Sequence, residues 1–172
     1  MHKCSIEVFN SYNWVVAQLN AIGAWLPQLV LRLFIAWEFG EAGFEKLHGT
    51  NWFADITFPF PFNLLPPDVS WNLSMFFEIV GAFAVAFGLA TRFFSLSLII
   101  LTIVAIASVH WPEHWDTLSQ LAMGYRFEDV DGDSYGNYKL PLIYIFAMLP
   151  LLFNGGGRLS IDYLLKRLCN KI

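Results

Sequence analysis

The sequence has few charged residues, and this shortage restricts the class of protein it can encode. Charged residues make up 14% of the 172 positions, whereas hydrophobic residues make up 56%. Soluble domains carry roughly 25% charged residues. A soluble globular fold is therefore disfavoured, and we expect residues 1–172 to form a single compact domain in a membrane.

The sequence also has few cysteines and lacks the common enzyme motifs. The two cysteines, Cys4 and Cys169, lie at opposite ends of the chain, so they form no CxxC or metal-binding motif. Both are expected on the cytoplasmic side, where a structural disulfide is disfavoured. The chain shows no phosphate loop, nucleophile elbow, dinucleotide fingerprint or basic patch suited to nucleic acid, and no cleavable signal peptide. These absences argue against a self-contained soluble enzyme and leave intramembrane redox or quinone chemistry open.

Long apolar runs are what the sequence does contain. Together with the low charge, they predict an all-α integral membrane four-helix bundle. Apolar stripes at helical spacing predict amphipathic N- and C-terminal helices that lie at the membrane surface. The spans are expected at about residues 26–47, 71–90, 93–110 and 139–154, and the amphipathic helices at about 6–24 and 161–168.

The distribution of basic residues predicts the orientation of these spans. With both termini in the cytoplasm, the outer loops hold only Arg126 and Lys139 as basic residues. We therefore expect a multi-pass protein of the bacterial inner membrane with both termini cytoplasmic. The basic residues expected on the inside are Lys3, Arg92, Arg158, Lys166, Arg167 and Lys171.

Four glutamates interrupt the apolar runs. Glu38, Glu41 and Glu45 lie in the first expected span, and Glu78 lies in the second. A charge at the centre of a membrane helix costs about 2.5–3.5 kcal/mol on insertion scales, so each of these carboxylates is a candidate proton or ligand site. At about 100° per residue, the three carboxylates of the first span share one helix face with His48.

The expected orientation places these residues in the outer half of the bundle, together with His110 and His114. Carboxylate and imidazole groups together suit a divalent transition metal, but they do not identify which one. In the alternative interpretation, the carboxylates pair with Lys46, Arg126 or Lys139 and only stabilise the bundle. The residues leave both interpretations open. The candidate metal ligands are Glu41, Glu45, Glu78, His48, His110 and His114.

The two outer loops differ in character. Residues 56–67 contain four prolines and no charged residue. This composition predicts either an interfacial anchor or a lid over a ligand cavity. The second loop begins like a calcium loop at Asp129, Asp131 and Asp133. Ser134 then stands where that loop needs glycine, so a standard calcium site is disfavoured.

Three segments read LRLFIAWEFGEAGFEKL, FEIVGAFAVAFGLATRFFSLSLIILTIVAI and GGGRLSIDYLL. Together they resemble the DoxX family of small four-helix membrane proteins. The loop segments FEKLHGTNWFADITFPFPFNLLP and YRFEDVDGDSYGNYKLPLIY resemble an HvfX-like branch of that family, associated with copper-buffering modified peptides. The resemblance also implies a cytoplasmic closure motif that contains Arg92, Arg158 and Asp162.

The residues and the resemblance together leave three hypotheses about function. The first is an inner-membrane accessory protein in copper or heavy-metal buffering, which binds a metal or a modified metal-binding peptide at the outward-facing glutamates. The second is a quinone-interacting subunit of a membrane oxidoreductase complex. The third is a non-catalytic scaffold in the lipid bilayer. The small residues around Gly40 and Gly81 are compatible with either packing within the chain or a homodimer.

Overall fold

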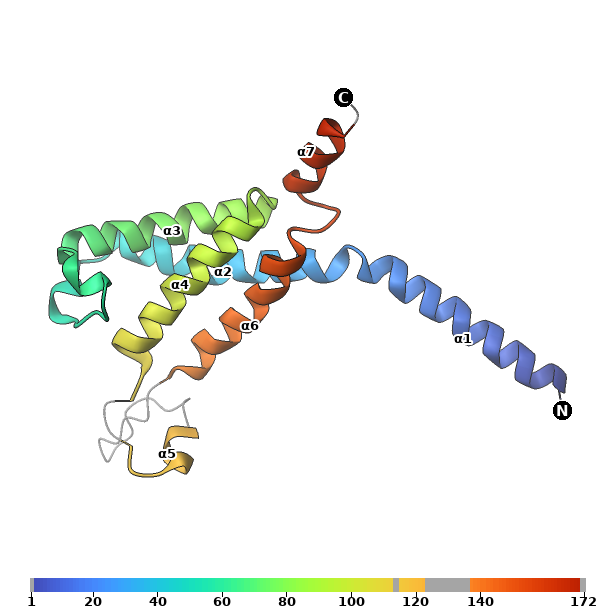
Figure 1. Ribbon diagram of the computed structural model, residues 1–172, viewed down its shortest axis with the longest axis horizontal. Coiled ribbons are helices and arrows are strands. Elements are labelled where there is room, and N and C mark those ends of the chain that lie inside the picture. Colours follow the sequence, from blue (N-terminus) through green and yellow to red (C-terminus); the bar gives the residue numbers. More distant parts are fainter. Residues whose placement is uncertain (1, 113–114, 123–136, 171–172) are drawn as a thin grey trace.

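The computed structural model describes residues 2–112, 115–122 and 137–170, and the described part of the chain is built from helices and their connections (Figure 1). His114, Arg126 and the aspartates of the second outer loop lie outside these residues. The helices are α1 (His2–Gly23), α2 (Leu26–His48), η1 (Phe53–Asp55), η2 (Phe62–Leu64), α3 (Pro67–Phe87), α4 (Thr91–Ala105), η3 (Ile106–His110, a π-helical turn), α5 (Leu118–Ala122), α6 (Lys139–Asn154) and α7 (Ile161–Cys169).

Three helical stretches are long and apolar enough to cross a membrane. They are Phe9–His48, Pro67–Phe87 and Thr91–His110. Helix α3 begins at Pro67, earlier than the expected span, because a proline in the first helical turn loses no hydrogen bond. Helix α6 occupies the expected interval as a shorter apolar helix, and its crossing of the membrane stays a prediction.

Helices α2 and α3 approach closely because glycine lies at their contact. A Cβ atom on Gly43 would lie 2.7 Å from Ile79 Cγ1 and 3.0 Å from Glu78 Cβ. A Cβ atom on Gly81 would lie 3.2 Å from Leu98 of α4. The small residues around Gly40 and Gly81 are therefore used within the chain, in the way that small residues allow membrane helices to pack.

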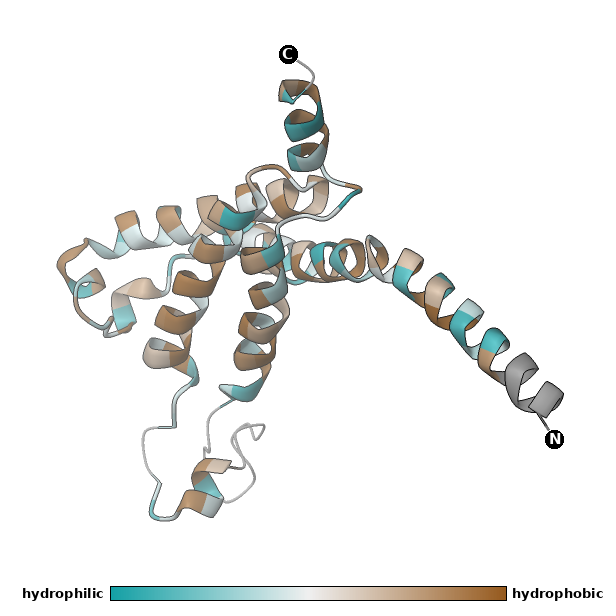
Figure 2. Ribbon diagram, turned by 45° about the vertical axis from the view of Figure 1, so that its right-hand side comes forward, coloured by the Kyte–Doolittle hydropathy of each residue, from teal (hydrophilic) through white to brown (hydrophobic). Residues whose placement is uncertain are grey.

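A compact apolar core joins α2, α3, α4 and α6 behind this contact. Its fully buried members include Ile35, Val85, Leu98 and Met148, one from each of α2, α3, α4 and α6. Outside the core, large apolar side chains of these helices are exposed, as expected for surfaces that face lipid. Figure 2 shows the resulting hydrophobic bands along α4 and α6.

The turn between α3 and α4 is tied to the C-terminal segment. Gly88 ends α3 in the left-handed conformation with φ +68°. The carboxylate of Asp162 accepts hydrogen bonds of 2.8 Å from the backbone N–H groups of both Ala90 and Thr91, at the start of α4. The carboxylate thus satisfies two donors that a helix start would otherwise leave free. We call this part of the molecule the closed end.

An arginine that the sequence analysis did not single out lies at the centre of the closed end. Arg32 is 1% exposed and donates hydrogen bonds to the carbonyl oxygens of Ala86 at 3.0 Å and Leu159 at 2.5 Å. Of the expected closure residues, Asp162 caps α4, and Arg92 donates to the carbonyl oxygen of Phe153 at 3.1 Å. Arg158 is exposed.

Removing the charge of Asp162 is expected to loosen the closed end. Asp162→Asn lacks the second acceptor oxygen and the charge, so we expect it to lower the free energy of unfolding by about 1.5–3 kcal/mol. The exposed control, Asp116→Asn, should change it by less than about 0.5 kcal/mol. Denaturant titration in detergent micelles measures both, and equal effects would contradict the capping role.

Helices α1 and α7 both project away from the core (Figure 1). Helix α1 exposes large side chains such as Tyr12 and Trp14, and α7 exposes Leu164 and Leu168. Ser160 caps the start of α7 by accepting a hydrogen bond from Tyr163 N. The placement of α1 and α7 at the membrane surface stays a prediction.

Candidate functional site

Helices α3 and α4 diverge from their shared turn at the closed end (Figure 1). At the opposite end, a cavity of about 490 Å³ lies between α2, α3, α4 and α6. The connection from α2 to α3 supplies one wall of this cavity. Leu73 and Ile100 line it and are exposed by 42% and 44%, so it borders the outer surface between α3 and α4.

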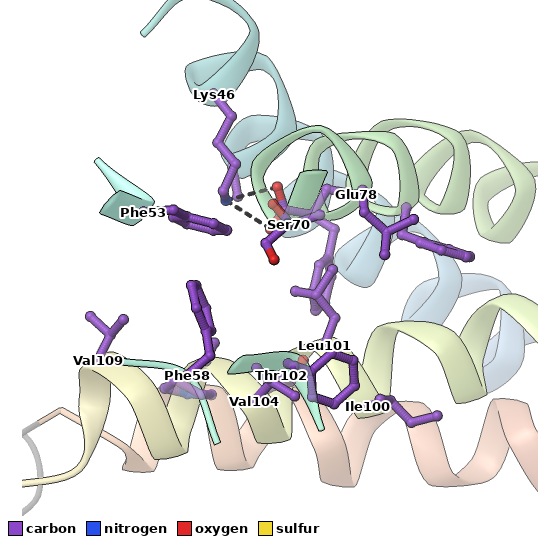
Figure 3. Close-up of a pocket in the computed structure, with 18 of the residues that line it drawn as sticks. Lys46, Phe53, Phe58, Ser70, Glu78, Ile100, Leu101, Thr102, Val104 and Val109 are labelled. Carbon is purple, nitrogen blue, oxygen red and sulfur yellow. Dashed lines mark hydrogen bonds and ion pairs between the residues drawn. The ribbon is translucent and has the colours of Figure 1, made fainter. Parts of the chain in front are cut away.

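Aromatic rings from the connection between α2 and α3 cover the cavity. Phe53 is 8% exposed, and its ring centroid lies 5.0 Å from that of Phe58 and 5.1 Å from that of Trp71. Figure 3 shows Phe53 and Phe58 at the cavity wall. Edge-on and tilted contacts between aromatic rings are favourable, and here they hold the uncharged segment against α3. The segment therefore forms part of the cavity wall. Whether it acts as a lid or as an interfacial anchor stays a prediction.

A buried ion pair also lines the cavity. The Lys46 ammonium of α2 lies 2.8 Å from both carboxylate oxygens of Glu78 on α3. The two side chains are only 15% and 4% exposed. The close approach at Gly43 brings the two helices near enough for this contact, and Figure 3 shows the pair facing the cavity.

Two further polar contacts lie along the cavity. The Tyr144 hydroxyl of α6 donates a hydrogen bond to the carboxylate of Glu38. His110 Nδ1 donates to the side-chain oxygen of Asn137, just before α6. The hydroxyl oxygen of Ser70 is buried and has no hydrogen-bond partner among the described residues. The cavity is thus mainly apolar, with a few polar groups placed at its wall.

The structure separates the residues that the sequence grouped as one site. Glu38, Glu78 and His110 line the cavity. Glu41 and Glu45 are exposed and do not line it. His48 is also exposed and its ring is bonded to the carbonyl of Phe44. Within the described ranges, no group of three or more His, Cys, Asp or Glu residues could hold a metal ion.

Three cavity residues carry chemistry that the sequence analysis did not assign to them. The sequence predicts Lys46 only as a structural partner of the carboxylates, and it does not predict Ser70 or Tyr144 as site residues. One signal was available for Lys46: a lysine and a glutamate stand in two neighbouring apolar segments, where each unpaired charge would be costly. No comparable sequence signal marks a single serine or tyrosine in an apolar run.

Comparison with known proteins identifies relatives of this chain. The profile of the DoxX family matches residues 28–111, the part that contains most of α2, all of α3 and α4, and the Lys46–Glu78 ion pair. A curated protein from Haemophilus influenzae, described as an uncharacterized protein, is 43% identical over 152 residues. The aligned region covers 87% of this chain and 90% of that relative. No solved structure matches the chain.

Proposed function

Because the chain belongs to the DoxX family of membrane proteins, we propose that its cavity is a binding site for a lipophilic molecule of the quinone class. In this proposal the protein is a quinone-interacting subunit of a membrane oxidoreductase complex. The role of this chain is to bind and orient the quinone, and the partner subunits supply the electrons. The expected orientation, with both termini in the cytoplasm, places the cavity toward the periplasm.

The observation that carries this proposal is the cavity itself. Small-molecule sites are concave, mostly apolar and about 300–1,000 Å³ in volume, with a few well-placed polar groups. The cavity of about 490 Å³ has those properties, with phenyl rings on one wall and the Lys46–Glu78 pair on another. Its exposed border at Leu73 and Ile100 supports entry from the lipid between α3 and α4.

The ion pair supports a ligand-binding role because it is a poor way to stabilise a bundle. Removing two charges from water costs several kcal/mol per ion, and well-packed apolar residues of the same volume are often neutral or better. Stability alone therefore does not explain why Lys46 and Glu78 are buried as a charged pair, whereas recognition of a polar ligand does.

Filling the cavity is expected to abolish quinone binding. Ala105 lines the cavity at the end of α4, whereas Ala107, two residues later, is exposed and does not line it. Ala105→Phe should weaken binding of decyl-ubiquinone at least tenfold, because the new ring occupies the site. Ala107→Phe should bind within about twofold of the wild type, since surface changes of this kind are usually tolerated.

The measurement is a titration of the purified protein in lipid nanodiscs, followed by quenching of tryptophan fluorescence. Trp52 lines the cavity and should report the bound quinone. Circular dichroism and thermal unfolding establish that each variant folds, and Ala42→Phe fills the same space from α2 if Ala105→Phe fails to fold. Equal binding by the cavity-filling variants and by Ala107→Phe would contradict the proposal.

An accessory role in copper or heavy-metal buffering is a second proposal. It has one supporting observation: the imidazole of His110 and the carboxylates of Glu38 and Glu78 line the same cavity. Among the described residues these three do not form a metal-binding group, so the role requires them to move together when a metal binds. Stoichiometric copper binding in equilibrium dialysis, lost in the Glu38→Gln/Glu78→Gln double variant, would favour this role. Binding of a modified metal-binding peptide at the same residues would favour it further.

A further inference from the structure

One end of the cavity has hydrogen-bond donors that the described residues leave unused. Ser70 is 9% exposed, and its hydroxyl oxygen has no partner in the described part of the chain. Lys46 Nζ donates to the two oxygens of Glu78. An ammonium carries three N–H donors, so a third remains available for a ligand. Both residues line the cavity, and Figure 3 shows Ser70 beside the ion pair.

We infer that this end of the cavity binds the carbonyl oxygen of an uncharged ligand headgroup, with Ser70 and Lys46 as its two donors. The inference rests on the proposed function and specifies the part of the ligand that is recognised. A buried hydroxyl without a partner is unfavourable, and a ligand oxygen between the two donors would satisfy it. The rings of Phe53 and Phe58 would then contact the apolar part of the headgroup.

Charge in the cavity wall explains why the headgroup is uncharged. The ammonium of Lys46 is already paired with Glu78. Glu38 adds a second carboxylate to the wall, so the carboxylates outnumber the ammonium. A phosphate or carboxylate headgroup would meet like charge in surroundings that screen it poorly. A carbonyl group accepts the same hydrogen bonds without that repulsion.

A second serine on the same helix provides a matched control. Ser74 also lines the cavity, about one turn further along α3. Its hydroxyl, however, already donates to the carbonyl oxygen of Trp71 at 2.9 Å. The two serine side chains therefore have the same size and a similar location. They differ in whether the hydroxyl already makes a hydrogen bond within the protein.

The test compares these serines with a probe that has carbonyl groups and one that has none. Decyl-ubiquinone and decylbenzene are titrated into nanodiscs of wild type, Ser70→Ala, Ser70→Thr and Ser74→Ala. We expect Ser70→Ala to raise the Kd for decyl-ubiquinone about three- to tenfold, the value of one hydrogen bond. Ser70→Thr keeps the hydroxyl and should restore binding. Ser74→Ala should stay within about twofold, and the Kd for decylbenzene should not depend on Ser70.

Each outcome separates this inference from the proposed function. If wild type binds neither probe, the proposed function fails and the inference fails with it. If wild type binds decyl-ubiquinone and Ser70→Ala binds it as tightly as Ser74→Ala does, the inference is overturned while quinone binding stands. Competitive displacement of decyl-ubiquinone by oleate, weakened by Ser70→Ala, would overturn the uncharged headgroup and assign the donors to an anion.

Discussion

Replacing Lys46 alone by methionine is expected to lower the free energy of unfolding by about 3–5 kcal/mol, because it leaves the carboxylate of Glu78 buried without its partner. The side chain of Glu78 is 4% exposed, so little water reaches its carboxylate to take the place of the ammonium. Thermal and denaturant unfolding of the purified protein in detergent micelles measure the loss. Lys166→Met on α7, where the lysine is exposed, is the matched control and should change stability by less than about 0.5 kcal/mol.

The double variant Lys46→Met/Glu78→Leu separates stability from ligand binding. Apolar pairs that replace a buried ion pair are often neutral or stabilising by about 1–4 kcal/mol, so this variant should fold as well as the wild type. It lacks the Lys46 donor, and its Kd for decyl-ubiquinone should rise about tenfold or more, as for loss of a hydrogen bond to a charged group. A double variant that folds and binds the quinone normally would show that the ion pair has no part in binding.

Replacing Gly88 by alanine is the second change for which we expect a large loss. Gly88 has φ +68°, a conformation that costs an L-residue about 1–2 kcal/mol. A Cβ atom there would also lie 2.4 Å from Ser160 Cβ and 2.5 Å from Arg32 Nη1. Overpacking adds about 1–3 kcal/mol. The free energy of unfolding should therefore fall by about 2–5 kcal/mol, with the closed end as the cause.

Gly23→Ala is the control for this substitution. Gly23 ends α1, and a Cβ atom there would meet nothing within 4 Å. Alanine in a helix is favoured over glycine by about 0.5–1 kcal/mol, so this variant should be neutral or slightly more stable. Both variants are compared by denaturant titration. A loss at Gly88 no larger than the change at Gly23 would mean that the tight packing of the closed end contributes little to stability.

Lengths and positions of helices could be predicted because they depend on local sequence. An apolar run of about 20 residues predicts a membrane helix wherever it occurs, and proline and glycine mark its ends. Helix α6 therefore falls on the expected interval, and α2 begins at the expected Leu26. Arg32 could not be recognised in the same way, because its role depends on carbonyl oxygens of Ala86 and Leu159, which are remote in the sequence.

The rotation of α2 about its axis explains why the glutamates that were expected in one site lie in different surroundings. At about 100° per residue, Glu41 and Glu45 lie roughly 160° from Gly43, whereas Lys46 lies roughly 60° from it. The packing of Gly43 against Ile79 fixes which face of α2 meets α3. Glu41 and Glu45 consequently face away from α3 and are exposed, and Lys46 reaches Glu78. The sequence showed the acidic stripe and the small face, but not which neighbour the small face would meet.

By itself, the amino-acid sequence determined that this is an all-helical membrane protein with costly charges in its apolar segments, because hydrophobicity and helical periodicity are properties of consecutive residues. The tertiary structure alone decided which charges are paired, which are exposed, and where the cavity lies. Those features arise from contacts between helices, such as the packing of Gly43 against Ile79, which together fix the rotation of each helix. Lys46 and Glu78 are 32 positions apart, and their pairing follows from that rotation.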